Sequence, residues 1–207
     1  EAKLAAAYQQ AAGLLHSLRE AAGQDLAARI TAELKYLQMT KAHFAVALPA
    51  KAPAADGCDE VQFMISPNPG EELKPVARIA SGGEMSRIML AIKVILASLD
   101  EVPTLIFDEI DTGLGGRALG SVAEKLVQVA QNTQAICVTH APVLAAYADN
   151  NLLVEKREQD GRTVTGVQEL AGEAKVQEIS RMLAGDKVTA TTKRQAEELI
   201  EAGRKLR

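Results

Sequence analysis

Two short, continuous apolar runs restrict what this 207-residue chain can fold into. Residues 104–107 read TLIF and residues 135–138 read AICV, with a helical pattern over 116–131 between them. Uninterrupted apolar runs of this length are typical of parallel strands that helices cover on both faces. A strand, a crossover helix and a second strand form a parallel pair with a right-handed connection. The sequence therefore predicts an α/β fold with a parallel-sheet core and flanking helices.

Composition and charge exclude several classes of protein. Hydrophobic residues make up 47% of the chain and aromatic residues only 3%, so the core is expected to be aliphatic. The net charge of −4 argues against a protein that binds nucleic acid through bulk positive charge. Two cysteines in dissimilar contexts form no disulfide framework and fit a reducing cytosol. No apolar run is long enough to span a bilayer, so no membrane contact is expected.

The first 42 residues have the pattern of a long helix. Apolar residues recur every three or four positions from Leu4 to Ala22, as in a heptad seam, although an ordinary amphipathic helix reads the same way over so short a stretch. The phase slips after Gly23, which predicts a stutter or a break, with Asp25 capping a renewed helix. Because the chain begins at Glu1 inside this pattern, we expect it to be part of a longer protein.

Further elements are expected on both sides of the parallel pair. Residues 43–48 and 60–66 predict the two strands of a hairpin, and proline-containing loops are expected over 49–57 and 66–75. Residues 152–156 and 163–170 predict two more strands around a turn at 159–162. Two helices are expected at the end, over 175–185, ended by Gly185, and over 191–206, begun by a threonine cap.

The stretch SGGEMSRIMLAIKVIL, which begins at Ser81, opens a helix with two glycines. Ser81 and Glu84 have the S-x-x-E spacing of a capping box, which explains both residues without any ligand. It does not explain Gly82 and Gly83, since glycine in a helix costs about 1 kcal/mol relative to alanine. Glycine allows close approach to the backbone, and a helix N-terminus favours an anion such as phosphate. The rest of the helix is apolar on nearly all sides, which predicts a buried helix.

Asp108 and Glu109 follow the TLIF strand directly. Ligands of open α/β sheets bind beyond the carboxyl ends of the strands. Adjacent carboxylates there point in different directions, so one can hold Mg²⁺ and the other can orient or deprotonate an attacking water. A pair of solvated loop acids is the alternative. The AICV strand ends in Thr139 and His140, at the same edge, where the histidine is either a structural residue or a hydrogen-bond donor to phosphate.

These motifs, in this order, resemble the second half of an ATP-binding-cassette ATPase head. SGGE is similar to the signature motif and LIFDE to the Walker B motif, while Asp111, in a glycine-rich turn, matches the D-loop aspartate and His140 the switch histidine. The resemblance implies that Asp108 binds Mg²⁺ and that Glu109 and His140 act in catalysis.

The same resemblance implies which residues of the chain contact ATP. Residues 81–84 and Asp111 are expected to contact the nucleotide, and the signature glycines Gly82 and Gly83 are expected to touch the γ-phosphate of ATP held by the opposite subunit. Transporter domains of this superfamily usually read SGGQ, whereas this chain reads SGGEMSR followed by DEIDTGLGG. These features, with the leading heptad helix, point to the SMC-like branch. Within it, the chain resembles the RecN-like DNA repair ATPases from about Leu15 to its end.

One departure and one missing motif qualify that resemblance. Residues 141–143 read APV where the family typically has Leu-Pro-Gln, which puts the segment after His140 in doubt but leaves the histidine in place. The phosphate-cradling pattern G-x-x-x-x-G-K-[ST] does not occur in the 207 residues. In the family, that Walker A loop lies in an N-terminal lobe beyond a coiled-coil arm. Residues 1–42 are therefore expected to be the returning end of the arm, and residues 43–207 the C-terminal lobe of the head.

The resemblance implies an ATPase of double-strand break repair and recombination that hydrolyses ATP only with its N-terminal lobe and as a homodimer. We expect this chain alone to be inactive, DNA to bind mainly to the full-length assembly, and the protein to be cytoplasmic and nucleoid-associated. Two alternatives stay open: the head of another SMC-like chromosome ATPase, and a non-catalytic dimerisation module. Glu109 favours an enzyme, because a structural module has no need of a water-activating base.

Overall fold

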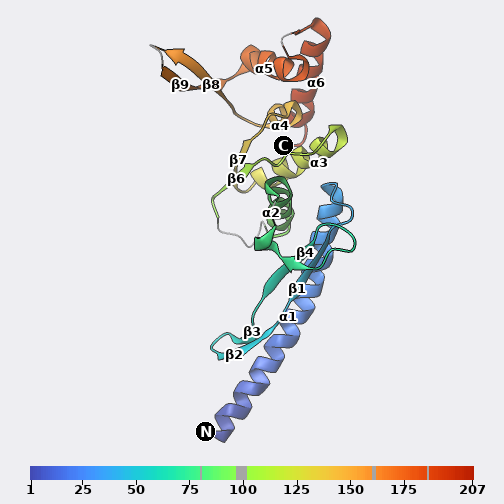
Figure 1. Ribbon diagram of the computed structural model, residues 1–207, viewed down its shortest axis with the longest axis vertical. Coiled ribbons are helices and arrows are strands. Elements are labelled where there is room, and N and C mark those ends of the chain that lie inside the picture. The colour runs from blue at the N-terminus through green and yellow to red at the C-terminus, as the bar shows by residue number, and fades with distance from the viewer. Residues whose placement is uncertain (80, 97–101, 160–161, 186) are drawn as a thin grey trace. The chain divides into compact units, whose positions relative to one another are not determined.

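The computed structural model describes residues 1–79, 81–96, 102–159, 162–185 and 187–207. The chain forms two compact units, residues 1–99 and 100–207, and each is described by itself. Figure 1 labels the elements in chain order.

The first unit begins with one uninterrupted helix, α1 (Ala2–Tyr36). Of the two expectations after Gly23, a stutter or a break, the break is therefore wrong. Asp25 does not cap a renewed helix but lies inside α1, where it pairs with Arg29 at 3.7 Å. Gly23 is buried because strand β1 crosses the helix there: a Cβ at Gly23 would lie 3.1 Å from Cβ of Val46. The glycine thus provides close packing and does not end the helix.

Two small antiparallel sheets pack along α1 (Figure 1). One has the order β1-β4-β5, in which β1 and β4 form the expected hairpin with a long connection. The other is the hairpin β2–β3, so the expectation of a plain loop over 49–57 is wrong. The strands are β1 (His43–Ala47), β2 (Ala50–Ala54), β3 (Gly57–Asp59), β4 (Gln62–Ser66) and β5 (Lys74–Pro75).

The β2–β3 hairpin owes its place to polar contacts with α1. Asp59 is buried and accepts from His16 Nδ1 at 2.7 Å and from Arg19 Nη1 at 3.3 Å. Tyr8 Oη donates to the carbonyl of Ala54 and also accepts from the amide of that residue, both at 3.0 Å. These contacts join residues that are 40 or more positions apart, so no local sequence pattern predicts them.

A 3₁₀ turn, η1 (Val76–Arg78), precedes helix α2 (Gly82–Leu96), which lies against α1. The expectation of a helix after Ser81 is confirmed. The buried apolar residues of this unit come from α1, the β1–β4 sheet and α2, and include Ile30, Leu34, Phe44, Ile65, Ile88 and Leu90. Arg87 is buried among the apolar positions of α2, and burial lowers the pKa of its guanidinium.

The second unit contains the predicted strand–helix–strand motif. Strands β6 (Thr104–Asp108) and β7 (Gln134–Val138) are parallel and in register, and α3 (Gly116–Ala130) connects them. The expectation that helices cover both faces is not met within the described part of this unit. Ile106, Ile136 and Val138 lie on one face of the pair and are 70%, 44% and 58% exposed.

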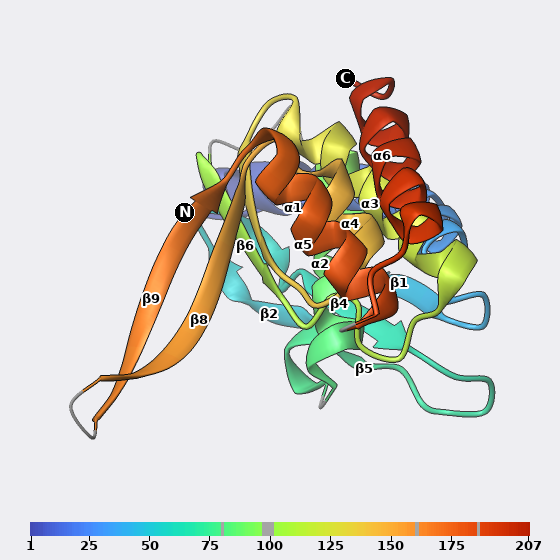
Figure 2. The same ribbon diagram turned by 90° about the horizontal axis from the view of Figure 1, so that it is seen from above.

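Three helices and a hairpin complete the second unit. They are α4 (Pro142–Tyr147), β8 (Asn151–Gln159), β9 (Arg162–Leu170), α5 (Gly172–Ala184) and α6 (Ala190–Arg204). The helix α4 has no counterpart in the sequence expectations. Buried Ala146, Ile179, Ala196 and Ile200 join α4, α5 and α6 in one apolar cluster. Strands β8 and β9 lie side by side and extend away from these helices (Figure 2).

The expected stop of α5 at Gly185 is confirmed. A threonine caps α6 as expected, but it is Thr189, two residues before the expected start of the helix at 191. Gly185 adopts φ +63° after α5, and its amide donates to the carbonyl of Arg181 at 2.7 Å. Thr189 caps α6 in a reciprocal box with Thr192. No helix in the described ranges is both long and apolar enough to cross a membrane.

Candidate active site

The parallel register of β6 and β7 brings the predicted carboxylates and histidine to one edge. Asp108 lies opposite Val138, so Glu109 on one strand and Thr139 and His140 on the other follow at the same end of the sheet. This confirms the expectation that the ends of TLIF and AICV share an edge. Asp108, Glu109 and the side chain of His140 are exposed there.

Glu109 has a backbone conformation that favours glycine. Its φ is +55°, whereas nearly all other non-glycine residues described have negative φ. A non-glycine residue in this region costs about 1–2 kcal/mol. The turn that holds it is closed by the amide of Thr112, which donates to the carbonyl of Glu109 at 3.0 Å. The strain marks Glu109 as a position where orientation of the side chain outweighs local stability.

Asp111 is buried beneath the histidine. Its Oδ2 accepts from Thr139 Oγ1 at 2.6 Å and from the backbone amide of His140 at 3.2 Å. His140 Nδ1 lies 3.3 Å from the same oxygen, while 87% of the histidine side chain is exposed. The carboxylate therefore lies beside Nδ1 of an imidazole that is largely exposed to solvent. Its contact with a nucleotide, implied by the resemblance, stays a prediction.

The pKa of Cys137 reflects the negative charge at this edge. It lies on β7 opposite Phe107, next to the acidic end of the pair. Burial, together with the negative charges of Asp111 and Asp108, raises the pKa of the Cys137 thiol to about 12. The site is thus a region of negative potential, which favours a cation.

Asp108 suits a magnesium ion that is shared with a nucleotide. Mg²⁺ is commonly bound by one or two carboxylates together with waters and substrate phosphates, without a full set of protein ligands. No group of three or more acidic, histidine or cysteine side chains able to hold a metal occurs among the residues that the structure describes. An exposed single carboxylate at the end of β6 fits the partial donor set that such a shared ion requires.

The SGGE segment belongs to the first unit. The amide of Glu84 donates to Ser81 Oγ at 3.4 Å, which is the serine half of the expected capping box. Ser81 and Gly82 are exposed and Gly83 is buried. The exposed start of α2 carries the positive end of a 15-residue helix. Whether these residues contact ATP stays a prediction.

Sequence reasoning missed two features of the second unit. The sequence indicates Thr139 only as the neighbour of His140, yet this threonine donates the shortest hydrogen bond to Asp111. A cluster of Lys175, Arg204 and Arg207 lines a cavity beside α5 and α6. The run GRKLR at 203–207 is a weak signal for the two arginines, but nothing in it points to Lys175.

Comparisons with known proteins give the chain its relatives. No protein-family model matches it. It is 41% identical over 208 residues to the DNA repair protein RecN of Streptomyces coelicolor, covering 93% of this chain and 36% of that protein. It is 43% identical over 200 residues to the DNA repair protein RecN of Bacillus subtilis, covering 89% of this chain and 35% of that protein. The chain spans about a third of the length of these curated relatives.

A solved structure shows the same fold. The Smc head domain with a coiled coil and joint derived from Pyrococcus yayanosii matches with a TM-score of 0.52 at 22% identity, over 75% of this chain and 28% of that one. At this identity the likeness concerns the fold alone. It confirms the expected head fold with its leading helix. By sequence the chain is similar to a segment of the DNA repair protein RecN, and its fold is similar to that of an Smc head domain.

Proposed function

We propose that this chain supplies half of a composite ATP-hydrolysis site in a RecN-like DNA repair protein. The observation that carries the proposal is the shared edge of β6 and β7, where strained Glu109 lies beside a histidine that Asp111 holds in place. A bound Mg²⁺ ion would neutralise charge on the phosphates, and Asp108 is the residue that would hold it. The acidic edge and the left-handed Glu109 support these roles.

Each residue at the edge has a distinct task in this proposal. Glu109 accepts the proton of the attacking water, for which an exposed carboxylate at the strand end is suited. His140 contacts the γ-phosphate through Nε2, because Nδ1 faces Asp111 at 3.3 Å. Thr139 restrains the Asp111 carboxylate from the next strand, at 2.6 Å. The Asp111–Thr139 pair acts by positioning the histidine, and the contact of Asp111 with ATP is part of the same proposal.

The SGGE segment completes the site of a second copy. Ser81, Gly82, Gly83 and Glu84 would meet the γ-phosphate of ATP held by the opposite subunit of a homodimer. The exposed backbone at Gly82 and the N-terminal end of α2 support this role, since helix N-termini bind phosphate. A side chain at Gly82 or Gly83 would occupy the position of the phosphate.

The rest of the ATP site must come from outside these 207 residues, which contain no Walker A sequence. We assign that loop to an N-terminal lobe, and we assign residues 1–42 to the end of a coiled-coil arm and residues 43–207 to the C-terminal lobe. Leu4 and Leu18 of the heptad seam are 78% and 60% exposed, so they are available to pack against the second helix of a coiled-coil arm. The chain alone should not hydrolyse ATP, and DNA binding and repair belong to the full-length assembly.

The test uses the full-length protein that carries this chain. Glu109→Gln should lower the turnover of ATP by about 10²–10⁴-fold and leave nucleotide binding intact. Glu158→Gln, the same change at an exposed position on β8, is the matched control and should leave turnover unchanged. Native turnover in Glu109→Gln would remove the water-activating role and favour a dimerisation module.

Mixing two inactive variants tests the arrangement across the dimer. Gly83→Gln should abolish ATP-dependent dimerisation and hydrolysis, although ATP still binds the Walker A lobe. In a dimer of Gly83→Gln with Glu109→Gln, one site receives both defects and the other receives neither. Mixing should restore up to half of the activity per site. If mixed dimers form and hydrolysis never returns, the glycines do not act on the partner's nucleotide.

A further inference from the structure

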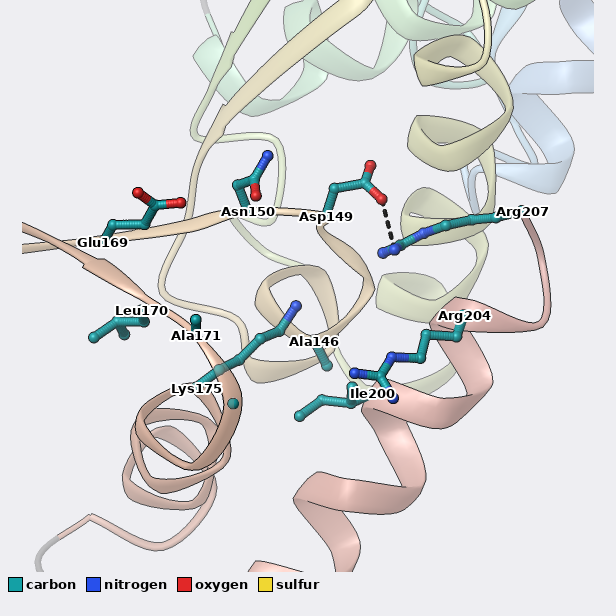
Figure 3. A pocket seen from close by; sticks show the side chains of 11 residues that line it. Ala146, Asp149, Asn150, Glu169, Leu170, Ala171, Lys175, Ile200, Arg204 and Arg207 are labelled. Atoms are coloured by element: carbon teal, nitrogen blue, oxygen red, sulfur yellow. Dashed lines mark ion pairs between the residues drawn. The ribbon is translucent and has the colours of Figure 1, made fainter.

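A basic cavity lies in the second unit, apart from the acidic strand edge. It has a volume of about 190 Å³, and its walls come from the start of α5, the end of α6 and the segments next to β8 and β9. Lys175 enters it from α5, and Arg204 and Arg207 enter from the end of α6 and the residues after it (Figure 3). One cationic side chain from α5 and two from the end of the chain thus meet at one opening.

The negative charges of the cavity do not balance these cations. Asp149 is bound by Arg207, whose Nη1 lies 2.5 Å from the carboxylate. Glu169 lies at the opposite end of the cavity, on β9 (Figure 3). Neither Lys175 nor Arg204 forms an ion pair with a carboxylate in the described parts of the chain. Lys175 donates only to a neutral group, the carbonyl of Ala148, at 2.6 Å.

The position of Lys175 is unfavourable without an anion. Burial lowers the pKa of its amino group, and repulsion by Arg207 and Arg204 lowers it further, while a smaller attraction by Asp149 acts in the opposite direction. The lysine also lies in the first turn of α5, where the helix dipole disfavours positive charge. The N-cap of this 13-residue helix is Ala171, which has no side-chain oxygen for the first amides. Three independent features therefore oppose the unliganded arrangement, and one oxyanion would offset all of them.

We propose that this cavity binds a phosphate group, held by Lys175, Arg204 and the N-terminal amides of α5. A guanidinium and an ammonium that approach one oxyanion from two helices form charge-assisted hydrogen bonds, and helix amides add to them. Arg207, which Asp149 and the carbonyl of Tyr147 hold, frames the opening. The phosphate can belong to a nucleic-acid backbone or to a small phosphoanion, and the two sources are separable by experiment.

The first experiment locates the anion. Inorganic phosphate replaces chloride at constant ionic strength, and amide NMR shifts of the chain are followed. The shifts at Gly172 and Glu173, the first two residues of α5, should saturate together. Arg204→Gln should raise the Kd for phosphate about tenfold, and Lys175→Gln should act in the same direction. Arg194→Gln is the matched control, because it removes the same charge from an exposed position on α6 and should change the Kd less than twofold.

The second experiment identifies the source of the phosphate. Binding of a fluorescent 20-base-pair duplex is measured by anisotropy over a salt series. If a backbone phosphate occupies the cavity, Arg204→Gln should reduce the magnitude of the negative slope of log binding constant against log salt concentration by about one. Arg194→Gln should leave that slope unchanged. An unchanged slope with saturable phosphate binding assigns the cavity to a small phosphoanion. Shifts that never saturate, or an Arg194→Gln effect equal to that of Arg204→Gln, would overturn the proposal.

Discussion

Gly203 provides a quantitative test of how tightly the helices of the second unit pack. It lies near the end of α6, and a Cβ built there would be 2.8 Å from the Cα of Tyr147 and 3.1 Å from its ring. The nearest atom is backbone, so a rotamer change cannot relieve the overlap, and α4 and α6 must move apart. Overpacking of this kind costs about 1–3 kcal/mol.

The steric cost has to be separated from helix propensity. Glycine to alanine within a helix stabilises by up to about 1 kcal/mol, which would mask part of the cost in Gly203→Ala. Gly120 is the matched control: it lies inside α3 of the same unit, and nothing lies within 4 Å of its built Cβ. Gly120→Ala should therefore stabilise the unit. Gly203→Ala should be less stable than Gly120→Ala by the overpacking cost alone, about 1–3 kcal/mol.

Urea unfolding followed by circular dichroism measures both variants in the 207-residue chain. Because both positions lie in the second unit, the comparison holds even if the two units unfold separately. Hydrogen exchange should show faster opening of α4 and α6 in Gly203→Ala only. The reasoning fails if the two variants are stabilised equally, since α4 and α6 would then be able to accept a methyl group between them.

Two further predictions concern titratable groups. The hydrogen bond from His16, with a smaller contribution from Arg19, holds the pKa of Asp59 below its usual value. These contacts therefore stabilise the first unit fully at pH values above the unfolded pKa of about 3.9. The stabilisation is lost as the pH falls through the lower pKa of the folded state. The free energy of unfolding, measured in urea between pH 7 and pH 3, should fall as the pH is lowered. Asp59→Asn should make this pH dependence weaker, and the exposed control Asp25→Asn should leave it unchanged. Because the thiolate is the reactive species, a pKa of about 12 should make Cys137 alkylate at pH 8 about 10³-fold more slowly than an unfolded thiol of pKa 8.5. Iodoacetamide labelling of a Cys58→Ser variant, with and without urea, measures this rate, and fast native labelling would contradict the burial.

Local pattern was sufficient for most of the secondary structure and for the acidic edge. The runs TLIF and AICV are continuous and apolar, so their strand character is visible in four letters each, and the helix between them requires a parallel pair. Parallel strands share their carboxyl edge, which brings Asp108, Glu109 and His140 together without any further information. The SGGE helix start, the glycine after α5 and the threonine cap of α6 are also local signals.

Only the tertiary structure decided what distant residues do to one another. Gly23 reads as a helix break, and it becomes a packing position because Val46 crosses α1 there. The buried Asp111 could not be told from a solvated loop acid until Thr139 and His140 were found within hydrogen-bond reach. The basic cavity joins α5 to the end of α6, and neither segment carries a motif. The physical reason is common to all three: the sequence encodes short-range periodicity and capping, whereas burial, close approach and charge balance depend on which segments pack together.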